Sequence, residues 1–294
     1  MTRVPFSILP PRFADWFQAR GWRVRDHQLD LLRHAQEGQD VLLIAPTGAG
    51  KTLAGFLPSL IELSTQKSNA PAGPGLHTLY ISPLKALAVD VARNLEMPAR
   101  DMNLRLRIET RTGDTSAAKR QRQRRDPPQI LLTTPEQLAL LLASPDSLTL
   151  FSSLRRVVLD ELHALVTSKR GDLLALALAR LRTLAPAMRV TGLSATVREP
   201  DELRRWIVAT PAQSSLVIAP PGAAADLSML DTRERLPWSG HGGTHAVREV
   251  YERIKSATTT LIFVNTRAQA EAIFQQLWRI NDDNLTIALH HGSL

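Results

Sequence analysis

Residues 41–52 read Val41-Leu42-Leu43-Ile44-Ala45-Pro46-Thr47-Gly48-Ala49-Gly50-Lys51-Thr52, and this stretch decides the fold. Its first five residues form a continuous apolar run, which is typical of a strand buried on both faces of a parallel sheet. The glycines behind it allow backbone N–H groups to turn inward around a polyphosphate, and a helix begins directly after them. A strand, a glycine-containing loop and a helix in this order predict a phosphate-binding loop.

Each residue type in this loop has a role in phosphate chemistry. Lys51 can reach the β and γ phosphates, and the hydroxyl of Thr52 can hold Mg²⁺. The loop itself is formed by Thr47, Gly48, Ala49 and Gly50. The generic pattern begins with glycine where this chain has Ala45, so an ordinary loop is the alternative interpretation. The position between a strand and a helix favours the phosphate-binding loop.

The alternation of strand and helix continues along the chain. Further apolar runs of strand length lie at 76–82, 130–133, 157–159 and 190–193. Helical patterns separate several of them, including one that begins at Leu84 and one at 136–142. Alternating strands and helices predict an α/β class fold, a doubly wound parallel sheet.

The composition and the hydrophobic periodicity of the sequence change after about Ala219. We predict a first domain at 1–218 and a linker at 219–245, because the segment after Ala219 is rich in Pro, Gly and Ala and has little periodicity. The remainder, 246–294, predicts a strand at 260–264, a helix at 268–280 and another strand at 285–289. Because two strands bury too little apolar surface to be stable alone, we interpret 246–294 as an incomplete second domain.

Two carboxylates follow the apolar run at 157–159, in the sequence Asp160-Glu161-Leu162-His163. Ligands of open α/β sheets collect at the carboxyl ends of the strands, so both side chains are placed for chemistry. Asp160 suits the Mg²⁺ shell, and Glu161 suits the orientation and deprotonation of an attacking water. His163 can relay between sites. The alternative is an acidic cap at the start of a helix, and the phosphate-binding loop upstream favours the catalytic interpretation.

Charge and composition narrow the function classes. The 294 residues include no cysteine, and the formal net charge is +8. The absence of cysteine excludes disulfide frameworks and thiolate zinc sites. No apolar run has the roughly 20 residues that a membrane span needs, so we expect no membrane association and a cytoplasmic location. The positive charge favours a nucleic-acid partner, and a base-composition bias toward arginine is the alternative. We interpret the basic run at 119–125 as a solvated helix face.

The phosphate-binding loop, Asp160-Glu161-Leu162-His163 and Ser194-Ala195-Thr196 resemble motifs I, II and III of superfamily 2 helicases, in the same order. The chain is most similar to the Lhr-like group, and within it to the ligase-associated DEXH-box branch of the DNA damage response. Three segments carry this second resemblance: Ser82-Pro83-Leu84-Lys85-Ala86-Leu87, Thr133-Thr134-Pro135-Glu136 and Leu261-Ile262-Phe263-Val264-Asn265-Thr266-Arg267. The resemblance implies a RecA-like P-loop NTPase domain followed by an incomplete second RecA-like domain.

The resemblance also assigns residues to the ATP site. Arg25 and Gln28 match the Q motif, in which the glutamine hydrogen-bonds the adenine edge. Ser194 and Thr196 match the motif that couples loss of the γ-phosphate to movement between domains, together with His163. Without the resemblance, Gln28 would be a solvated polar residue at a helix start, and Ser194 and Thr196 would be turn residues.

A second set of residues corresponds to the family's contacts with the nucleic-acid backbone. It comprises Pro83, Lys85, Arg111, Gly113, Thr134, Pro135 and Glu136, with Asn265, Thr266 and Arg267 from the second domain. Contacts to phosphates carry no sequence information, which suits a motor that steps along any sequence. For Asn265 and Thr266 the alternative is a cap on the following helix.

The resemblance implies an ATP- and Mg²⁺-dependent DNA helicase or translocase with ATP hydrolysis stimulated by single-stranded DNA. It further implies 3′ to 5′ polarity, a role in bacterial DNA repair, and partnership with a DNA ligase and a nuclease. The expected substrate is single-stranded or partly duplex DNA, with RNA or a hybrid as alternatives. Since the family's motifs V and VI lie beyond Leu294, we expect weak hydrolysis by this chain alone. An RNA helicase and a non-catalytic ATP-dependent nucleic-acid-binding fragment are the alternative functions.

Overall fold

The computed structural model describes residues 8–65, 75–195, 197–208, 213–222, 224–230, 232 and 243–291. The chain forms two compact units, residues 1–223 and 224–294. Within the described residues, no helix combines the length and the apolar character that crossing a bilayer requires.

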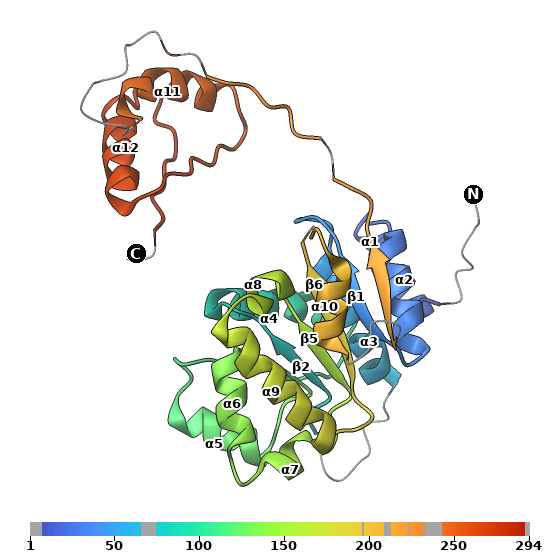
Figure 1. The fold of residues 1–294 in the computed structure, drawn as a ribbon. Coiled ribbons are helices and arrows are strands. Elements are labelled where there is room, and N and C mark those ends of the chain that lie inside the picture. Colours follow the sequence, from blue (N-terminus) through green and yellow to red (C-terminus); the bar gives the residue numbers. More distant parts are fainter. Residues whose placement is uncertain are drawn as a thin grey trace. The chain divides into compact units, whose positions relative to one another are not determined.

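The first unit is built on a sheet of seven strands, and every pair of neighbours runs parallel (Figure 1). The strands are β1 (Asp40–Ile44), β2 (Thr78–Ile81), β3 (Ile108–Arg111), β4 (Ile130–Thr133), β5 (Arg156–Leu159), β6 (Arg189–Ser194) and β7 (Ser214–Ile218). Their order across the sheet is β3-β4-β2-β5-β6-β1-β7. The predicted α/β class and parallel sheet are therefore confirmed.

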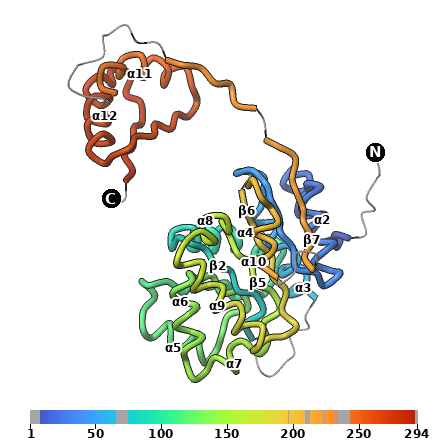
Figure 2. Tube along the Cα trace, viewed as in Figure 1, coloured from blue at the N-terminus to red at the C-terminus, as the bar shows by residue number. Residues whose placement is uncertain are grey.

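Helices cover both faces of this sheet, as the trace in Figure 2 shows. In β1, Val41 and Leu43 belong to one apolar core, and Leu42 and Ile44 to the other. The first core is completed by α1 (Pro11–Ala19), α2 (Asp26–Gln36), α3 (Lys51–Thr65) and α4 (Lys85–Asp101). The second is completed by α6 (Pro135–Leu142), α7 (Ser147–Phe151), α8 (Leu162–Val166), α9 (Lys169–Leu184) and α10 (Pro200–Ile207). Burial on both faces explains why the strands read as continuous apolar runs.

Because the strands are parallel, their carboxyl ends lie along one edge of the sheet, where the loops that carry the predicted motifs begin. Backbone hydrogen bonds extend the ladders into these loops. Ala45 N donates to Ser194 O at 3.0 Å, and Asp160 N donates to Ile81 O at 2.9 Å. Ser82 N donates to Thr133 O at 3.0 Å. Loops that are far apart in the sequence are thus fixed side by side.

The predicted strands of this unit match β1, β2, β4, β5 and β6 to within a few residues at each end. Sequence reasoning missed β7 (Ser214–Ile218), whose first two residues are serines. It also missed α1, which begins at Pro11 in a stretch that reads as irregular. Proline at the first helical position removes an N–H that a helix leaves unpaired, so it is a helix-start signal here.

The second unit contains the 3-10 helix η2 (Thr244–Ala246) and the helices α11 (Val247–Lys255) and α12 (Arg267–Arg279). The strands predicted at 260–264 and 285–289 are wrong, since no strand occurs among the described residues of this unit. Leu261 and Phe263 are 77% and 89% exposed. An apolar run becomes a strand only when a neighbour pairs its N–H and C=O groups, and here neither segment has one.

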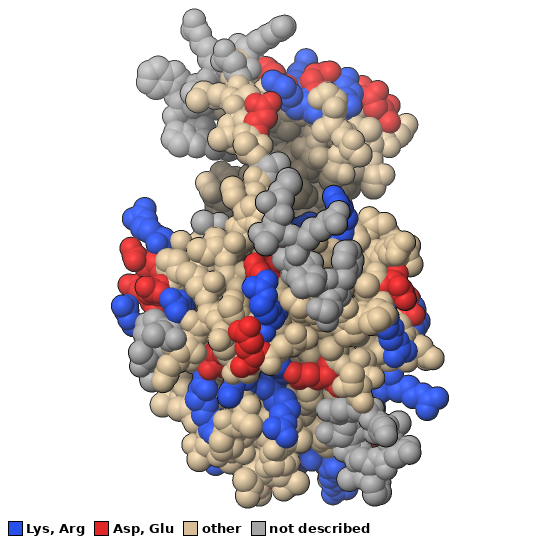
Figure 3. Space-filling model, turned by 90° about the vertical axis from the view of Figure 1, so that its right-hand side faces the viewer, with Lys and Arg blue, Asp and Glu red and all other residues tan. Residues whose placement is uncertain are grey.

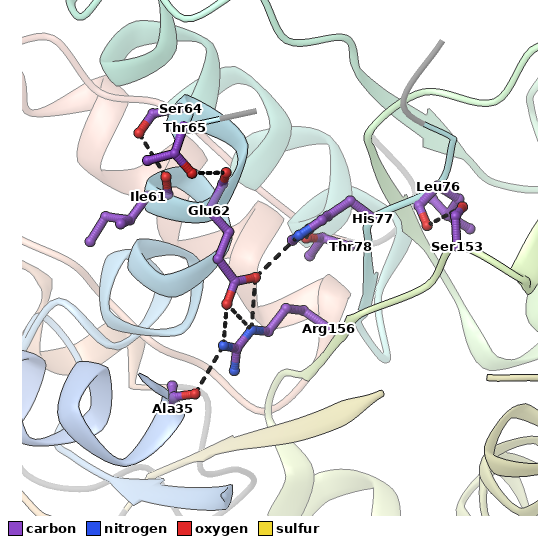
Figure 4. A network of polar contacts seen from close by, with 10 residues as sticks. All are labelled: Ala35, Ile61, Glu62, Ser64, Thr65, Leu76, His77, Thr78, Ser153 and Arg156. Atoms are coloured by element: carbon purple, nitrogen blue, oxygen red, sulfur yellow. Dashed lines mark hydrogen bonds and ion pairs between the residues drawn. The ribbon is translucent and has the colours of Figure 1, made fainter. Parts of the chain in front are cut away.

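A partly buried polar network lies at the amino-terminal end of β5 (Figure 4). The Arg156 guanidinium, at the start of β5, forms an ion pair with Glu62 near the end of α3. Arg156 also donates to the carbonyl of Ala35 in α2 at 3.0 Å. His77 Nε2 lies 3.1 Å from Glu62 Oε2. The Arg156 guanidinium therefore joins α2 and α3 to β5, the strand that leads to Asp160.

The pKa of Glu62 reflects this network. Burial alone would raise the pKa of Glu62, but hydrogen bonds from His77 and Arg156 lower it from 4.5 to about 2. A carboxyl group whose pKa is lower in the folded chain stabilises the fold at every pH above its unfolded pKa. That contribution is lost as the pH falls from about 4.5 toward 2.

We expect Glu62→Gln to lower the free energy of unfolding at pH 7 by about 1–3 kcal/mol, because it leaves the buried Arg156 charge without its partner. Since the Glu62 side chain is itself 38% exposed, the lower half of this range is expected. Urea unfolding at pH 7 and pH 3 measures the effect, and the difference from wild type shrinks at pH 3. Glu96→Gln, on the exposed side of α4, is the matched control. An equal difference at both pH values would contradict this account.

Candidate nucleotide site

The phosphate-binding loop joins β1 to α3. Gly48 and Gly50 have φ angles of +78° and +77°, a conformation that favours glycine. A Cβ at Gly50 would also lie 2.8 Å from the Gln28 side chain. Lys51 is 7% exposed, and its Nζ donates to Ala45 O at 2.9 Å. The Lys51 side chain therefore lies back across the phosphate-binding loop, with its ammonium group on the first residue of that loop.

Side chains from the start of α2 hold three successive carbonyls of this loop. Arg25 donates to Gly48 O at 3.1 Å, and Gln28 Nε2 donates to Gly50 O at 3.3 Å. His27 Nε2 lies 2.9 Å from Ala49 O. In a trans peptide the N–H points opposite to the C=O. The N–H groups of Gly50 and Lys51 therefore point away from α2, which prepares them to meet an anion.

Gln28 is used differently from the predicted adenine contact. Its Oε1 accepts from Arg25 N at 3.0 Å while its Nε2 donates to Gly50 O, so both ends of the amide bind backbone. To contact adenine, the amide would have to exchange one of these bonds. The adenine role of Gln28 stays a prediction, and the structure adds a second role in bracing the loop.

A cavity of about 750 Å³ opens beside the loop. Its lining comprises Arg23, Val24, Arg25, Asp26 and His27, Pro46, Thr47, Gly48 and Ala49, and Pro220, Pro221 and Gly222. This volume is in the usual range for a small-molecule site. Thr52, the predicted Mg²⁺ ligand, is the second residue of α3 and is partly buried.

The carboxylate pair follows β5. Asp160 is 6% exposed, and its Oδ1 accepts from Glu161 N at 2.9 Å. Its Oδ2 accepts from the hydroxyl of Tyr80, which is fully buried on the neighbouring strand β2. Burial and the adjacent Asp160 carboxylate raise the pKa of Tyr80, so the phenol stays a donor. Sequence reasoning missed Tyr80, because its contact with Asp160 depends on β2 lying beside β5.

His163 connects the carboxylate pair with the loop after β6. Its Nε2 lies 3.5 Å from Glu161 Oε2, and its Nδ1 lies 3.0 Å from Ser194 Oγ. Ala195 N donates to the same Nδ1 at 3.4 Å. Because a backbone N–H can only donate, Nδ1 is the acceptor, and a neutral ring carries its proton on Nε2, toward Glu161. Thr196 lies outside the described residues.

The predicted nucleic-acid residues of the first unit lie at or just after the carboxyl ends of β2, β3 and β4, on the other half of the sheet. Lys85 Nζ lies 3.0 Å from Asp114 Oδ2, which joins the start of α4 to the loop after β3. Arg170 forms an ion pair with Glu136 and donates to Pro83 O at 2.7 Å. Hydrogen bonds from Arg170 lower the pKa of Glu136 to about 2. The structure thus brings these loops together.

Several of these residues do not face solvent. Arg111 is 7% exposed and donates to Arg120 O at 3.1 Å, so it fastens α5 (Ala117–Arg125) to β3. Thr134 and Pro135 are buried as well, whereas Gly113 is exposed. Contact between the Arg111 guanidinium and a phosphate would require movement of α5. The basic run at 119–125 is a helix, as predicted, and Gln123 within it is buried.

The three predicted residues of the second unit lie at the start of α12. The Thr266 hydroxyl accepts from Gln269 N at 3.2 Å, and Asn265 N donates to Gln269 Oε1 at 3.2 Å. Arg267 is the first residue of the helix. Thr266 therefore fills the capping role that the sequence left as the alternative, and its contact with nucleic acid stays a prediction.

A phosphate-binding loop after β1 and a carboxylate pair after β5, with β6 between these strands, define the P-loop NTPase class. The chain belongs to the DEAD/DEAH box helicase family, whose model matches residues 25–203. The predicted membership of superfamily 2 is thereby confirmed, and so is the Lhr-like resemblance by the relatives that follow.

Several curated relatives carry Lhr names. The chain is 32% identical to the ATP-dependent helicase Lhr-Core of Methanocaldococcus jannaschii, over 98% of this chain and 35% of the relative. It is 35% identical to the Lhr helicase/probable uracil glycosylase of Mycolicibacterium smegmatis, over 95% of this chain and 19% of the relative. The chain thus spans about a third or less of the length of these proteins.

A solved structure of the Mycobacterium smegmatis helicase Lhr bound to ssDNA and AMP-PNP is also similar. The TM-score is 0.80 at 32% sequence identity, and the match covers 97% of this chain and 38% of that chain. This neighbour shares the RecA-like arrangement of a parallel sheet, which agrees with the predicted fold class.

We expect His27→Ala to weaken binding of ATP and of tripolyphosphate alike, by about five- to tenfold, since it frees the Ala49 carbonyl from α2. Titration calorimetry with both ligands measures the effect. His34→Ala is the matched control, because His34 lies on the same helix and contacts Ser215 and Glu37 instead. Unchanged affinity for tripolyphosphate would show that His27 does not position the loop.

Proposed function

We propose that this chain is the ATP-binding part of an ATP-dependent DNA helicase or translocase of the Lhr type. The observation that carries this proposal is the chain of contacts from Glu161 through His163 to Ser194. It connects the residue suited to activate water with the loop after β6. A nucleotide-binding module without hydrolysis has no need of such a connection. The names of the similar Lhr helicases support the same activity.

The proposed cofactors are ATP and Mg²⁺. The residues fit this ion, because Asp160 offers a carboxylate at the end of β5 and Thr52 offers a hydroxyl at the start of α3. Hard oxygen donors of this kind are what Mg²⁺ takes, together with phosphate oxygens. When bound, the ion supplies neutralisation of charge on the β and γ phosphates.

The proposed mechanism assigns one task to each residue. Lys51 leaves Ala45 O and binds the phosphates, while the N–H groups of Gly50 and Lys51 hold their oxygens. Glu161 orients a water and accepts its proton as the water oxygen bonds to the γ-phosphorus and the bond to the β–γ bridging oxygen breaks. A change in the charge of Glu161 alters its contact with His163 Nε2, and His163 transmits this change to Ser194 through Nδ1.

The finer functional assignments follow from the family and are proposals as well. They are hydrolysis stimulated by single-stranded DNA, 3′ to 5′ polarity, bacterial DNA repair in the cytoplasm, and partnership with a DNA ligase and a nuclease. The Mycobacterium smegmatis Lhr helicase, which was solved with ssDNA, supports DNA as the polymer.

The loops after β2, β3 and β4 are the proposed track for the nucleic-acid strand. Lys85, Gly113 and Glu136 are exposed there. Lys85 and Arg170 are ion-paired with Asp114 and Glu136, and Arg111 is buried. Backbone N–H groups and hydroxyls, rather than a strip of lysines, are therefore the proposed contacts with phosphates. Figure 3 shows a different face, on the side of α2 and β7, where basic and acidic side chains are mixed.

We expect Glu161→Gln to lower the rate of ATP hydrolysis by about 100-fold or more, because an amide cannot accept the proton of the attacking water. The affinity for ATP should stay within about twofold of wild type, because the amide has the same shape as the carboxylate. Hydrolysis is measured in a longer version of the chain that continues through the proposed second domain. Glu96→Gln, on the exposed side of α4, is the control for loss of a carboxylate outside the nucleotide site. Hydrolysis by Glu161→Gln at the wild-type rate would favour a role in binding only.

The polymer is tested in the same assay, with single-stranded DNA and RNA of equal length. Stimulation by DNA supports the proposed substrate. Stimulation by RNA alone would overturn the DNA assignment and support an RNA helicase, which could require the 2′-hydroxyl.

A further inference from the structure

The chain that leaves β7 emerges beside the phosphate-binding loop. β7 pairs with β1 in parallel, with Ile218 opposite Ile44. Ala219 N then donates to Ile44 O at 2.8 Å, which extends the ladder by one residue. Two parallel strands that end at the same level release their loops side by side. The segment 220–222 is therefore held next to Pro46 by the sheet itself.

This segment lines the cavity of about 750 Å³ beside the loop. Gly222 approaches the loop closely, since a Cβ built on it would lie 3.9 Å from Cβ and Cγ of Pro46. Residue 224, two positions further, is the start of the second unit. The last residues before the second unit thus form part of the cavity lining.

The cavity lining combines two kinds of side chain. Pro220 and Pro221 offer apolar rings, a φ angle fixed by the ring, and no backbone N–H. They give a phosphate no donor, but they suit the face of an aromatic ring. The same lining includes Arg23 and Arg25, whose guanidinium groups can stack on aromatic faces. This chemistry suits a planar base whose triphosphate binds the neighbouring loop.

We propose that Pro220, Pro221 and Gly222 form the wall against which the base of the bound nucleoside triphosphate packs. This inference rests on the proposed function, because it concerns the same nucleotide. Its consequence is that the base, and not the triphosphate, contacts the first residues of the connection to the second unit. A bound nucleotide then acts on that connection directly, in addition to acting through His163 and Ser194.

The test compares ATP with tripolyphosphate, which carries the same phosphates without a base. The 294-residue chain is titrated with both ligands as wild type, as Pro221→Gly and as Pro145→Gly. Pro145 is the matched control, because it is an exposed loop proline of the same unit outside the cavity lining. Both substitutions free one φ angle of the unfolded chain, and thermal melting confirms that each variant is folded.

We expect Pro221→Gly to bind ATP about fivefold more weakly, which corresponds to about 1 kcal/mol. Its affinity for tripolyphosphate should equal that of wild type, and Pro145→Gly should match wild type for both ligands. Unchanged ATP affinity, or an equal loss for both ligands, would overturn the proposed wall and leave the proposed function intact. Failure of wild type to bind either ligand would overturn the proposed function, and this inference with it.

Discussion

The parallel register of the seven strands is the constraint on which the rest of the molecule depends. It places all carboxyl ends on one edge, and hydrogen bonds such as Ala45 N to Ser194 O continue the ladder into the loops. Backbone groups buried on both faces must be paired, so a strand cannot slip without losing a full set of bonds. The geometry of the site is thus fixed by the sheet before any functional side chain is considered.

The strand order divides that edge into two halves. β5, β6 and β1 are neighbours, and they carry the carboxylate pair, the loop with Ser194 and the phosphate-binding loop. β2, β4 and β3 are neighbours on the other side, and they carry the proposed track for nucleic acid. The boundary runs between β2 and β5, where the Tyr80 hydroxyl binds Asp160 and Asp160 N binds Ile81 O. A change at Asp160 can therefore reach β2 through these two hydrogen bonds.

The sequence predicted those features that depend on local pattern. Residues 41–52 carry an apolar run followed by two glycines, so the loop and its flanking strand and helix could be placed from the residues alone. Features that depend on contacts between distant elements could not be predicted from the sequence. Tyr80 became part of the site because β2 lies beside β5, and Arg111 became buried because α5 packs over it. The strands expected at 260–264 and 285–289 failed for the same reason, since pairing rather than composition makes a strand.

The central claim is that the loop between β1 and α3 binds a triphosphate through Lys51. The most direct test is calorimetric titration of AMP-PNP with Mg²⁺ into wild type and Lys51→Ala, with melting curves to show that both are folded. We predict saturable 1:1 binding by wild type and a loss of at least about tenfold in affinity for Lys51→Ala, because the lysine supplies a charge-assisted contact to the phosphates. Equal affinity of the two proteins would contradict the account.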